Sequence, residues 1–129
     1  MKIAIIDDDS IFQFMIKKMI EKIDPSHQLL LFNDGQDALD FIQTNRTLLD
    51  VLPELILLDI NMPILNGWQF LDRLKKLEAT DYQPIIYMVS SSIDQDDVLK
   101  SKTYVELKGY LIKPLSKQQL TNLLNFIKV

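Results

Sequence analysis

The sequence predicts an α/β domain in which a five-stranded parallel sheet is covered by helices on both faces. Five short apolar segments alternate along the chain with five segments of helical periodicity, an order typical of doubly wound parallel sheets. One apolar segment, Leu55–Leu58, lies between Pro53 and Pro63 and is apolar at every position, as in strands buried on both faces. At 129 residues, we expect a single domain spanning 1–129.

The first half of the chain gives two strands and two helices before the buried segment. We expect strands over residues 2–6 and 28–32, and a first helix that begins at Ser10 as N-cap. Two sets of apolar residues step by fours through that helix, and we expect its methionines to lie in the core. These sets are Ile11, Met15, Met19 and Ile23, with Phe12, Ile16 and Ile20 alongside. His27 follows a turn, so we expect it to be exposed.

The second half repeats the alternation. Asn66-Gly67 begins a third helix, and strands follow over residues 84–89 and 109–112. Ser92 with Gln95, and Ser116 with Gln119, have the capping-box spacing that begins the last two helices. We expect a second helix, marked by Ala38, Leu39, Phe41 and Ile42, to end near Asn45. The connector over residues 46–54 extends this helix or packs over its end.

Composition narrows the class of partner. The chain has no cysteine and a net charge of −4, which excludes disulfides and argues against nucleic acid or an anionic membrane as the main partner. The apolar runs are too short for a signal peptide or a membrane span. We therefore expect a cytoplasmic protein.

Chemically reactive side chains follow four of the predicted strands. Asp7 and Asp8 follow the first strand, Asp59 the third, Ser90 the fourth and Lys113 the fifth. The carboxyl ends of parallel strands meet at one edge, where open α/β sheets bind ligands. Clustered carboxylates repel one another, so one is protonated or a cation binds. Oxygen ligands without His or Cys favour Mg²⁺, and a remaining carboxylate is free to act as a nucleophile that forms an acyl phosphate.

In this order, the strand-end residues resemble those of receiver domains of two-component response regulators, the CheY-like family with sheet order 2-1-3-4-5. The resemblance covers essentially the whole chain. It implies a stand-alone response regulator, not an enzyme, that accepts a phosphoryl group on Asp59 from a sensor histidine kinase or a histidine phosphotransfer protein. It also implies a conformational signal passed to an unknown downstream protein or along a phosphorelay.

The resemblance assigns the remaining roles residue by residue. It implies that Mg²⁺ or Mn²⁺ is bound by Asp7, Asp8, Asp59 and the backbone carbonyl of Asn61. Ser90 and Lys113 match the residues that contact the phosphoryl group, Tyr110 matches the aromatic switch residue, and Gly67 matches the glycine opening the third helix. Ser91 stands where many members have Ala or Gly.

Three other functions compete with this interpretation. An aspartyl phosphatase would carry a second acid where Asn61 stands, and Asn61 cannot act as one. A flavin-binding domain would need a phosphate loop after the first strand, where the acidic run would repel phosphate. An unphosphorylated receiver-like interaction module is the remaining alternative, and the complete set of strand-end residues argues against it.

Overall fold

The computed structural model describes residues 1–77 and 81–128, and its elements alternate as expected. The strands are β1 (Lys2–Ile6), β2 (Gln28–Phe32), β3 (Leu55–Leu58), β4 (Ile85–Ser90) and β5 (Leu107–Ile112). The helices are α1 (Ser10–Ile23), α2 (Gly35–Thr44), α3 (Gly67–Lys75), α4 (Gln95–Ser101) and α5 (Lys117–Lys128). None of the helices in the described ranges is long and apolar enough to cross a membrane.

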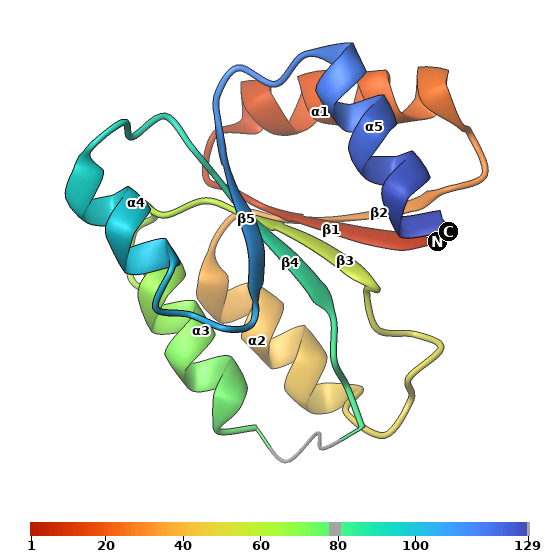
Figure 1. The fold of residues 1–129 in the computed structure, drawn as a ribbon. Helices are drawn as coiled ribbons and strands as arrows, with labels where there is room; N and C mark the ends of the chain where they lie inside the picture. The colour runs from red at the N-terminus through yellow and green to blue at the C-terminus, as the bar shows by residue number, and fades with distance from the viewer. Residues whose placement is uncertain (78–80, 129) are drawn as a thin grey trace.

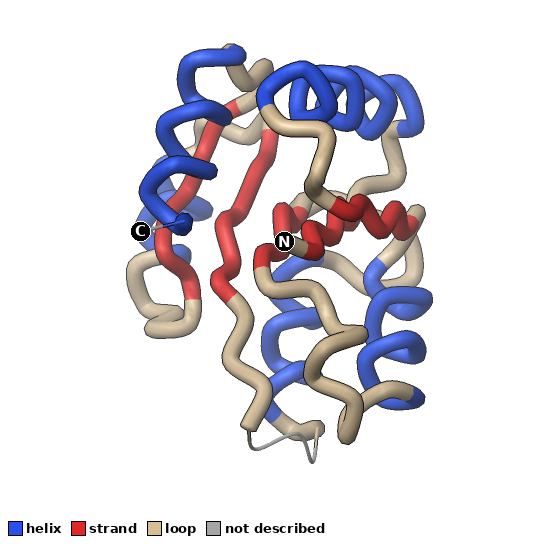
Figure 2. Tube along the Cα trace, turned by 90° about the vertical axis from the view of Figure 1, so that its right-hand side faces the viewer, coloured by secondary structure: helices blue, strands red, loops and turns tan. Residues whose placement is uncertain are grey.

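The strands form one parallel sheet of order β2-β1-β3-β4-β5, which confirms the predicted fold class (Figure 1). Helices α1 and α5 cover one face, and α2 and α3 cover the other, so the sheet lies between two layers (Figure 2). β3 occupies the centre and all four of its side chains are buried. A strand apolar at every position fits this place because both of its faces meet a helical layer.

Register determines which side chains meet at the carboxyl edge. Ile6 at the end of β1 pairs with Leu58 at the end of β3, so Asp7 and Asp59 leave the sheet side by side. β4 continues two residues beyond its pairing with β3 and ends at Ser90, which pairs with Ile112 of β5. The next residue, Lys113, donates its backbone N–H to Ser90 at 2.9 Å. The four strand ends therefore meet at one edge, as predicted.

Two predicted helix starts were wrong. The N-cap of α1 is Asp9, whose Oδ1 accepts hydrogen bonds from the Ile11 and Phe12 backbone N–H groups. Ser10 is instead the first helical residue. α4 is capped by Asp94, and Ser92 donates from its hydroxyl to Asp97 at 2.7 Å. In both places several short polar residues competed for the same cap, and they differ little in capping free energy.

The other two predicted helix starts were confirmed. α3 begins at Gly67 with Asn66 as its N-cap, and Asn66 and Gln69 form a reciprocal capping box that was not predicted. Ser116 and Gln119 exchange the two capping-box hydrogen bonds, of 2.9 and 3.0 Å, at the start of α5.

The predicted core was right for one stripe of α1 and half right for the other, in which Met19 and Ile23 are partly buried against the core. Phe12, Ile16 and Ile20 are buried, whereas Ile11 is 71% and Met15 48% exposed. The expectation that the α1 methionines lie in the core was therefore wrong for Met15.

The prediction for His27 was also wrong, because it is buried. It lies 3.1 Å from the N-terminal amine of Met1, a neighbour brought close by the pairing of β1 with β2.

The connector between α2 and β3 does not extend the helix. Leu52 is buried in the cluster beneath α2 and α3, while Leu48 and Leu49 stay exposed. Lys2 donates from its ammonium group to the backbone carbonyl of Asp50, which ties this connector to β1.

Candidate functional site

Three carboxylates gather at the carboxyl edge of the sheet. One oxygen from each of Asp7, Asp8 and Asp59 lies within 4.8 Å of the others. Asp7 and Asp59 are buried, and Asp8 is exposed. Two negative charges about 4 to 5 Å apart repel by roughly 3 to 4 kcal/mol at an effective dielectric near 20, so this arrangement favours a bound cation.

Asp59 is a buried carboxylate with a raised pKa. It is 6% exposed, and its Oδ1 accepts a hydrogen bond of 2.9 Å from the Ile60 backbone N–H. Burial raises its pKa from 3.8 to about 6; the charge of Asp7 adds to the rise, while Lys113 opposes it. A carboxylate whose ionised form is disfavoured in this way is stabilised by any cation that reaches it.

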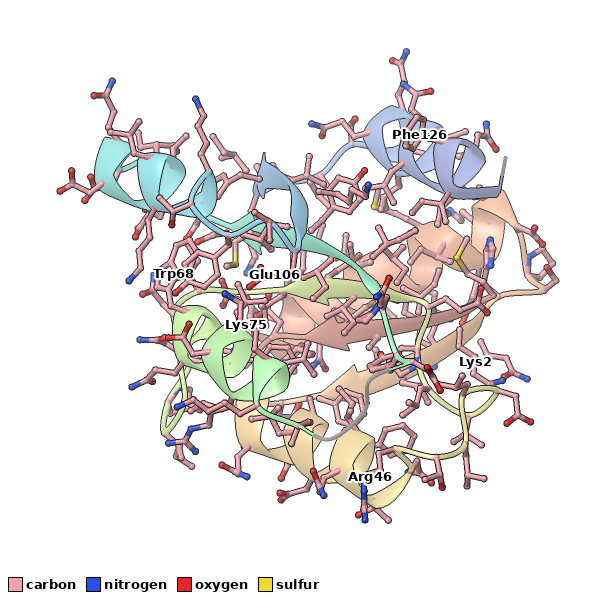
Figure 3. The ribbon with its side chains drawn as sticks, turned by 60° about the horizontal axis from the view of Figure 1, so that its bottom comes forward. Lys2, Arg46, Trp68, Lys75, Glu106 and Phe126 are labelled. Atoms are coloured by element: carbon pink, nitrogen blue, oxygen red, sulfur yellow. The ribbon has the colours of Figure 1, made fainter. Side chains whose placement is uncertain are left out.

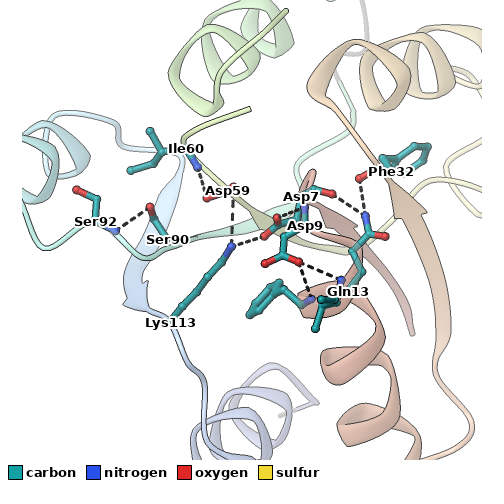
Figure 4. Close-up of polar contacts among 11 residues, drawn as sticks. Asp7, Asp9, Gln13, Phe32, Asp59, Ile60, Ser90, Ser92 and Lys113 are labelled. Carbon is teal, nitrogen blue, oxygen red and sulfur yellow. Dashed lines mark hydrogen bonds and ion pairs between the residues drawn. The ribbon is translucent and has the colours of Figure 1, made fainter. Parts of the chain in front are cut away.

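Both carboxylate oxygens of Asp7 have partners within the site. Its Oδ1 accepts from the Asp9 backbone N–H at 2.9 Å, and its Oδ2 lies 2.7 Å from the Lys113 ammonium (Figure 4). Burial raises the pKa of Asp7 despite the opposing effect of Lys113. The side chain is thus kept in one orientation toward the centre of the cluster.

Lys113 is the cation of the site. Its Nζ is 2.7 Å from Asp7 and 3.9 Å from Asp59, and the side chain is 15% exposed. The same ammonium lies 4.2 Å from the centre of the Phe12 ring. The peptide bond from Lys113 to Pro114 is cis. One positive charge therefore faces two carboxylates from the end of β5.

β4 ends at the hydroxyl residue Ser90, and the loop that follows contacts the aromatic residue Tyr110. Ser90 is fully buried, and its Oγ accepts from the Ser92 backbone N–H at 3.2 Å. Tyr110 of β5 is half-buried and donates its hydroxyl to the Ser92 carbonyl at 2.8 Å. Ser90 and Tyr110 thus contact the same loop residue. Asn61 lies exposed in the loop after β3.

Gly67 is required because α3 begins very close to the backbone of the segment that follows β3. A Cβ at Gly67 would lie 2.4 Å from the backbone oxygen of Asp59. The Gly67 N–H donates to the Ile60 carbonyl at 2.8 Å. The glycine therefore lets the start of α3 pack directly on the segment that carries Asp59.

Two residues of the site escaped the sequence analysis, Phe12 and Gln13 on α1. The apolar spacing of α1 predicts only that Phe12 is a core residue. Nothing in that spacing indicates that the Lys113 ammonium lies over its ring. Gln13 is buried and contacts the backbone of Asp7. Gln13 lies three and seven residues before Ile16 and Ile20, so its spacing places it on their face of the helix, but the sequence did not show that this face is the more buried one.

The donor set fits a hard divalent cation. Three carboxylates supply oxygen ligands, and the described part of the cluster contains no histidine ligand. The pKa of Asp59 is raised first by burial and then by the charge of Asp7, and a cation would offset both effects. Mg²⁺ takes one or two carboxylates together with water and phosphate oxygens. The arrangement suits a cation placed between acidic side chains and a phosphoryl group.

A parallel sheet of this order, with an acidic cluster and a lysine at its carboxyl edge, defines the class of receiver domains in two-component signalling. Residues 3–125 match the family model described as "Response regulator receiver domain", and the chain belongs to this family. Receiver domains are in general signalling modules rather than enzymes, and they typically bind Mg²⁺ through acidic residues.

Individual relatives agree with this assignment. The chain is similar to a two-component response regulator from Cytophaga hutchinsonii, with a TM-score of 0.86, 28% identity, and 98% and 96% of the two chains covered. It is 27% identical to the probable methanogenesis regulatory protein FilR2 of Methanothrix harundinacea, covering 98% of this chain and 80% of that one. It is 32% identical to the transcriptional regulatory protein CpxR of Escherichia coli K12, covering 92% of this chain but 45% of CpxR. The chain spans about half the length, or less, of several curated relatives.

Proposed function

We propose that residues 1–129 act as a response regulator receiver domain that is phosphorylated on Asp59. The observation that carries the proposal is the buried Asp59 carboxylate, which lies beside Asp7 and Asp8 and within 3.9 Å of the Lys113 ammonium. A nucleophile, two acidic neighbours that fit a cation, and a fixed positive charge are the groups that phosphoryl transfer requires.

The donor in this proposal is a phosphohistidine on a sensor histidine kinase or a histidine phosphotransfer protein. An Asp59 oxygen attacks phosphorus and forms a P–O bond, while the P–N bond to the imidazole breaks. The imidazole keeps the electron pair and takes up a proton. Lys113 faces the developing charge on the phosphoryl oxygens, and the buried Ser90 hydroxyl offers them a hydrogen bond.

A divalent cation completes the site in this proposal. Asp7, Asp8 and Asp59 would hold Mg²⁺ or Mn²⁺ with the backbone carbonyl of Asn61. The bound ion supplies neutralisation of the charge on the transferring phosphoryl oxygens. Because the carboxylates otherwise repel one another, the same ion also stabilises the ionised form of Asp59.

The signal in this proposal leaves through the loop after β4. A Ser90 hydroxyl that turns toward a phosphoryl group must change its bond with the Ser92 N–H, and Ser92 also accepts from Tyr110. Phosphorylation would bias an existing equilibrium between two arrangements of this loop. The face built by α4, β5 and α5 would then present a changed surface to a downstream protein or to the next member of a phosphorelay.

The test is intact mass after incubation with acetyl phosphate, with and without Mg²⁺. In that reaction the Asp59 oxygen displaces acetate. We expect one phosphoryl adduct that requires Mg²⁺, is released by hydroxylamine and is absent from Asp59→Asn. Asp81→Asn, at an exposed position, is the matched control and should be modified like the wild type.

Two outcomes would contradict the proposal. An adduct that persists in Asp59→Asn would place the acceptor elsewhere. No adduct on the wild type, from acetyl phosphate or from a panel of phosphorylated histidine phosphotransfer proteins, would favour a receiver-like module that is never phosphorylated.

A further inference from the structure

A buried glutamine lies next to the acidic cluster without touching its carboxylates. Gln13 belongs to the first turns of α1 and is 5% exposed. Its neighbours on the buried side of the helix, Phe12 and Ile16, are apolar and belong to the core. A buried amide in such a place is costly unless its N–H groups are hydrogen-bonded.

The Gln13 amide joins the ends of two strands. Its Nε2 donates to the Asp7 carbonyl and to the Phe32 carbonyl, both at 2.8 Å (Figure 4). The Phe32 carbonyl also accepts from the Asp7 backbone N–H at 3.0 Å. The peptide groups on both sides of Asp7 are therefore fixed, the one before it by Phe32 and the one after it by Gln13.

The second of these peptide groups links Asp7 to Asp8. Asp8 is exposed, so the direction of its side chain depends chiefly on how the backbone leaves Asp7. Mg²⁺ requires near-ideal octahedral geometry, and hydrogen bonds behind the ligands orient them and are worth roughly 10- to 100-fold in metal affinity. By fixing the Asp7–Asp8 peptide group, Gln13 thus fixes the positions of both acidic residues relative to Asp59.

We infer that Gln13 is a positioning residue for divalent cation binding, acting through the main chain of Asp7. The inference rests on the proposed function, because it deepens the role given there to Asp7 and Asp8. A purely structural role for Gln13 would change the stability of the fold and leave the affinity of the folded protein for the cation unchanged. Metal affinity therefore separates the two roles.

The experiment compares Gln13→Met with a stability-matched control on the same helix. Methionine keeps the length and much of the volume of glutamine and removes both N–H donors. Ile16→Val, at a buried core position one turn further on, lowers stability without touching Asp7. Urea unfolding establishes how far each variant is destabilised, and calorimetric titration with Mg²⁺ measures Kd for the folded full chain.

We expect Kd for Mg²⁺ to rise by about 10-fold or more in Gln13→Met and to stay within about twofold of wild type in Ile16→Val. The rate of adduct formation from acetyl phosphate should approach the wild-type rate at saturating Mg²⁺, with its midpoint shifted by the same factor. If Gln13→Met does not fold, Gln13→Asn keeps the amide on a side chain one methylene shorter and should also weaken Mg²⁺ binding.

The outcomes separate this inference from the proposed function. If the wild type binds Mg²⁺ and forms the adduct while Gln13→Met and Ile16→Val have equal affinities, the inference is wrong and the proposed function stands. If the wild type does not bind Mg²⁺, the metal site of the proposed function is wrong as well.

Discussion

The Lys113 ammonium lies closer to Asp7, at 2.7 Å, than to Asp59, at 3.9 Å. The positive charge of the site is therefore paired chiefly with a residue proposed to bind the cation, and only weakly with the proposed phosphoacceptor. A cation on Asp7 competes with the ammonium for the same carboxylate. Lys113 is consequently well placed to turn toward Asp59 when Asp7 gains another partner.

Removing the ammonium should destabilise the fold in a pH-dependent way. In Lys113→Ala, Asp7 and Asp59 face one another without the lysine, and breaking a buried ion pair costs about 3 kcal/mol or more. The loss should be large at pH 8 and smaller near pH 4.5, where protonation removes charge from the carboxylates. Urea unfolding at the two pH values measures it. Lys117→Ala, at an exposed position, should change stability little at either pH, and an equal loss in both variants would contradict the prediction.

Phe12 should be energetically coupled to Lys113. The ammonium lies 4.2 Å from the ring centre and is largely shielded from water, conditions under which a cation–π contact contributes about 1 to 2 kcal/mol. A double-mutant cycle with Phe12→Leu and Lys113→Met isolates that coupling. Phe14 and Lys18 form a matched pair at 5.4 Å on the exposed side of the same helix. We expect that pair to show a much smaller coupling, and equal values for both pairs would count against a special role for Phe12.

Gly67→Ala should be the most damaging alanine substitution among the three glycines. The new methyl group would lie 2.4 Å from the Asp59 backbone oxygen, so the start of α3 or the segment carrying Asp59 must move. Overpacking of this kind costs about 1 to 3 kcal/mol. Gly109→Ala is the control, because its Cβ would meet the Tyr87 ring at 3.1 Å, and a side chain can yield. Similar losses of stability in the two variants would show that the start of α3 does not pack tightly against the Asp59 backbone.

The strand ends were predictable because alternation and apolar runs determine a parallel sheet, and a parallel sheet brings its carboxyl ends together. The side of α1 that is buried was not predictable, since Met15 and Ile16 belong to stripes of equal spacing. Which stripe meets the sheet depends on how the helix leaves Asp9, a tertiary property. The burial of His27 likewise depends on Met1, which is close in space through the pairing of β1 with β2 and distant in sequence.

Contacts across layers were also outside the reach of sequence patterns. Lys75 of α3 pairs with Glu106 at 2.9 Å, and the Trp68 ring lies 5.2 Å from that of Tyr104. Figure 3 shows Trp68, Lys75 and Glu106 on this side of the sheet, where α3 meets the segment leading into β5. Each residue reads as an ordinary surface or core position in its own segment. Only the packing of α3 beside β5 makes them partners.

Asp59→Asn should stabilise the fold at neutral pH. The pKa of Asp59 in the folded chain, about 6, lies above its ordinary value of 3.8, so between about pH 4 and 6 the folded state binds more protons than the unfolded state. Stability therefore falls as pH rises through this window and stays lower above it. At about 1.4 kcal/mol per pKa unit, the cost of ionising Asp59 is at most roughly 3 kcal/mol.

Asparagine avoids that cost and retains an oxygen to accept the Ile60 N–H. We expect Asp59→Asn to gain about 1 to 3 kcal/mol at pH 7 and little or nothing at pH 4, measured by urea unfolding without divalent cations. Asp81→Asn, at an exposed site, should show no such pH-dependent gain. A bound cation would stabilise the ionised Asp59 carboxylate. Saturating Mg²⁺ should therefore stabilise the wild type more than Asp59→Asn and reduce the difference in stability between them. A gain that is the same at pH 4 and pH 7 would mean that the charge of Asp59 is not its cause.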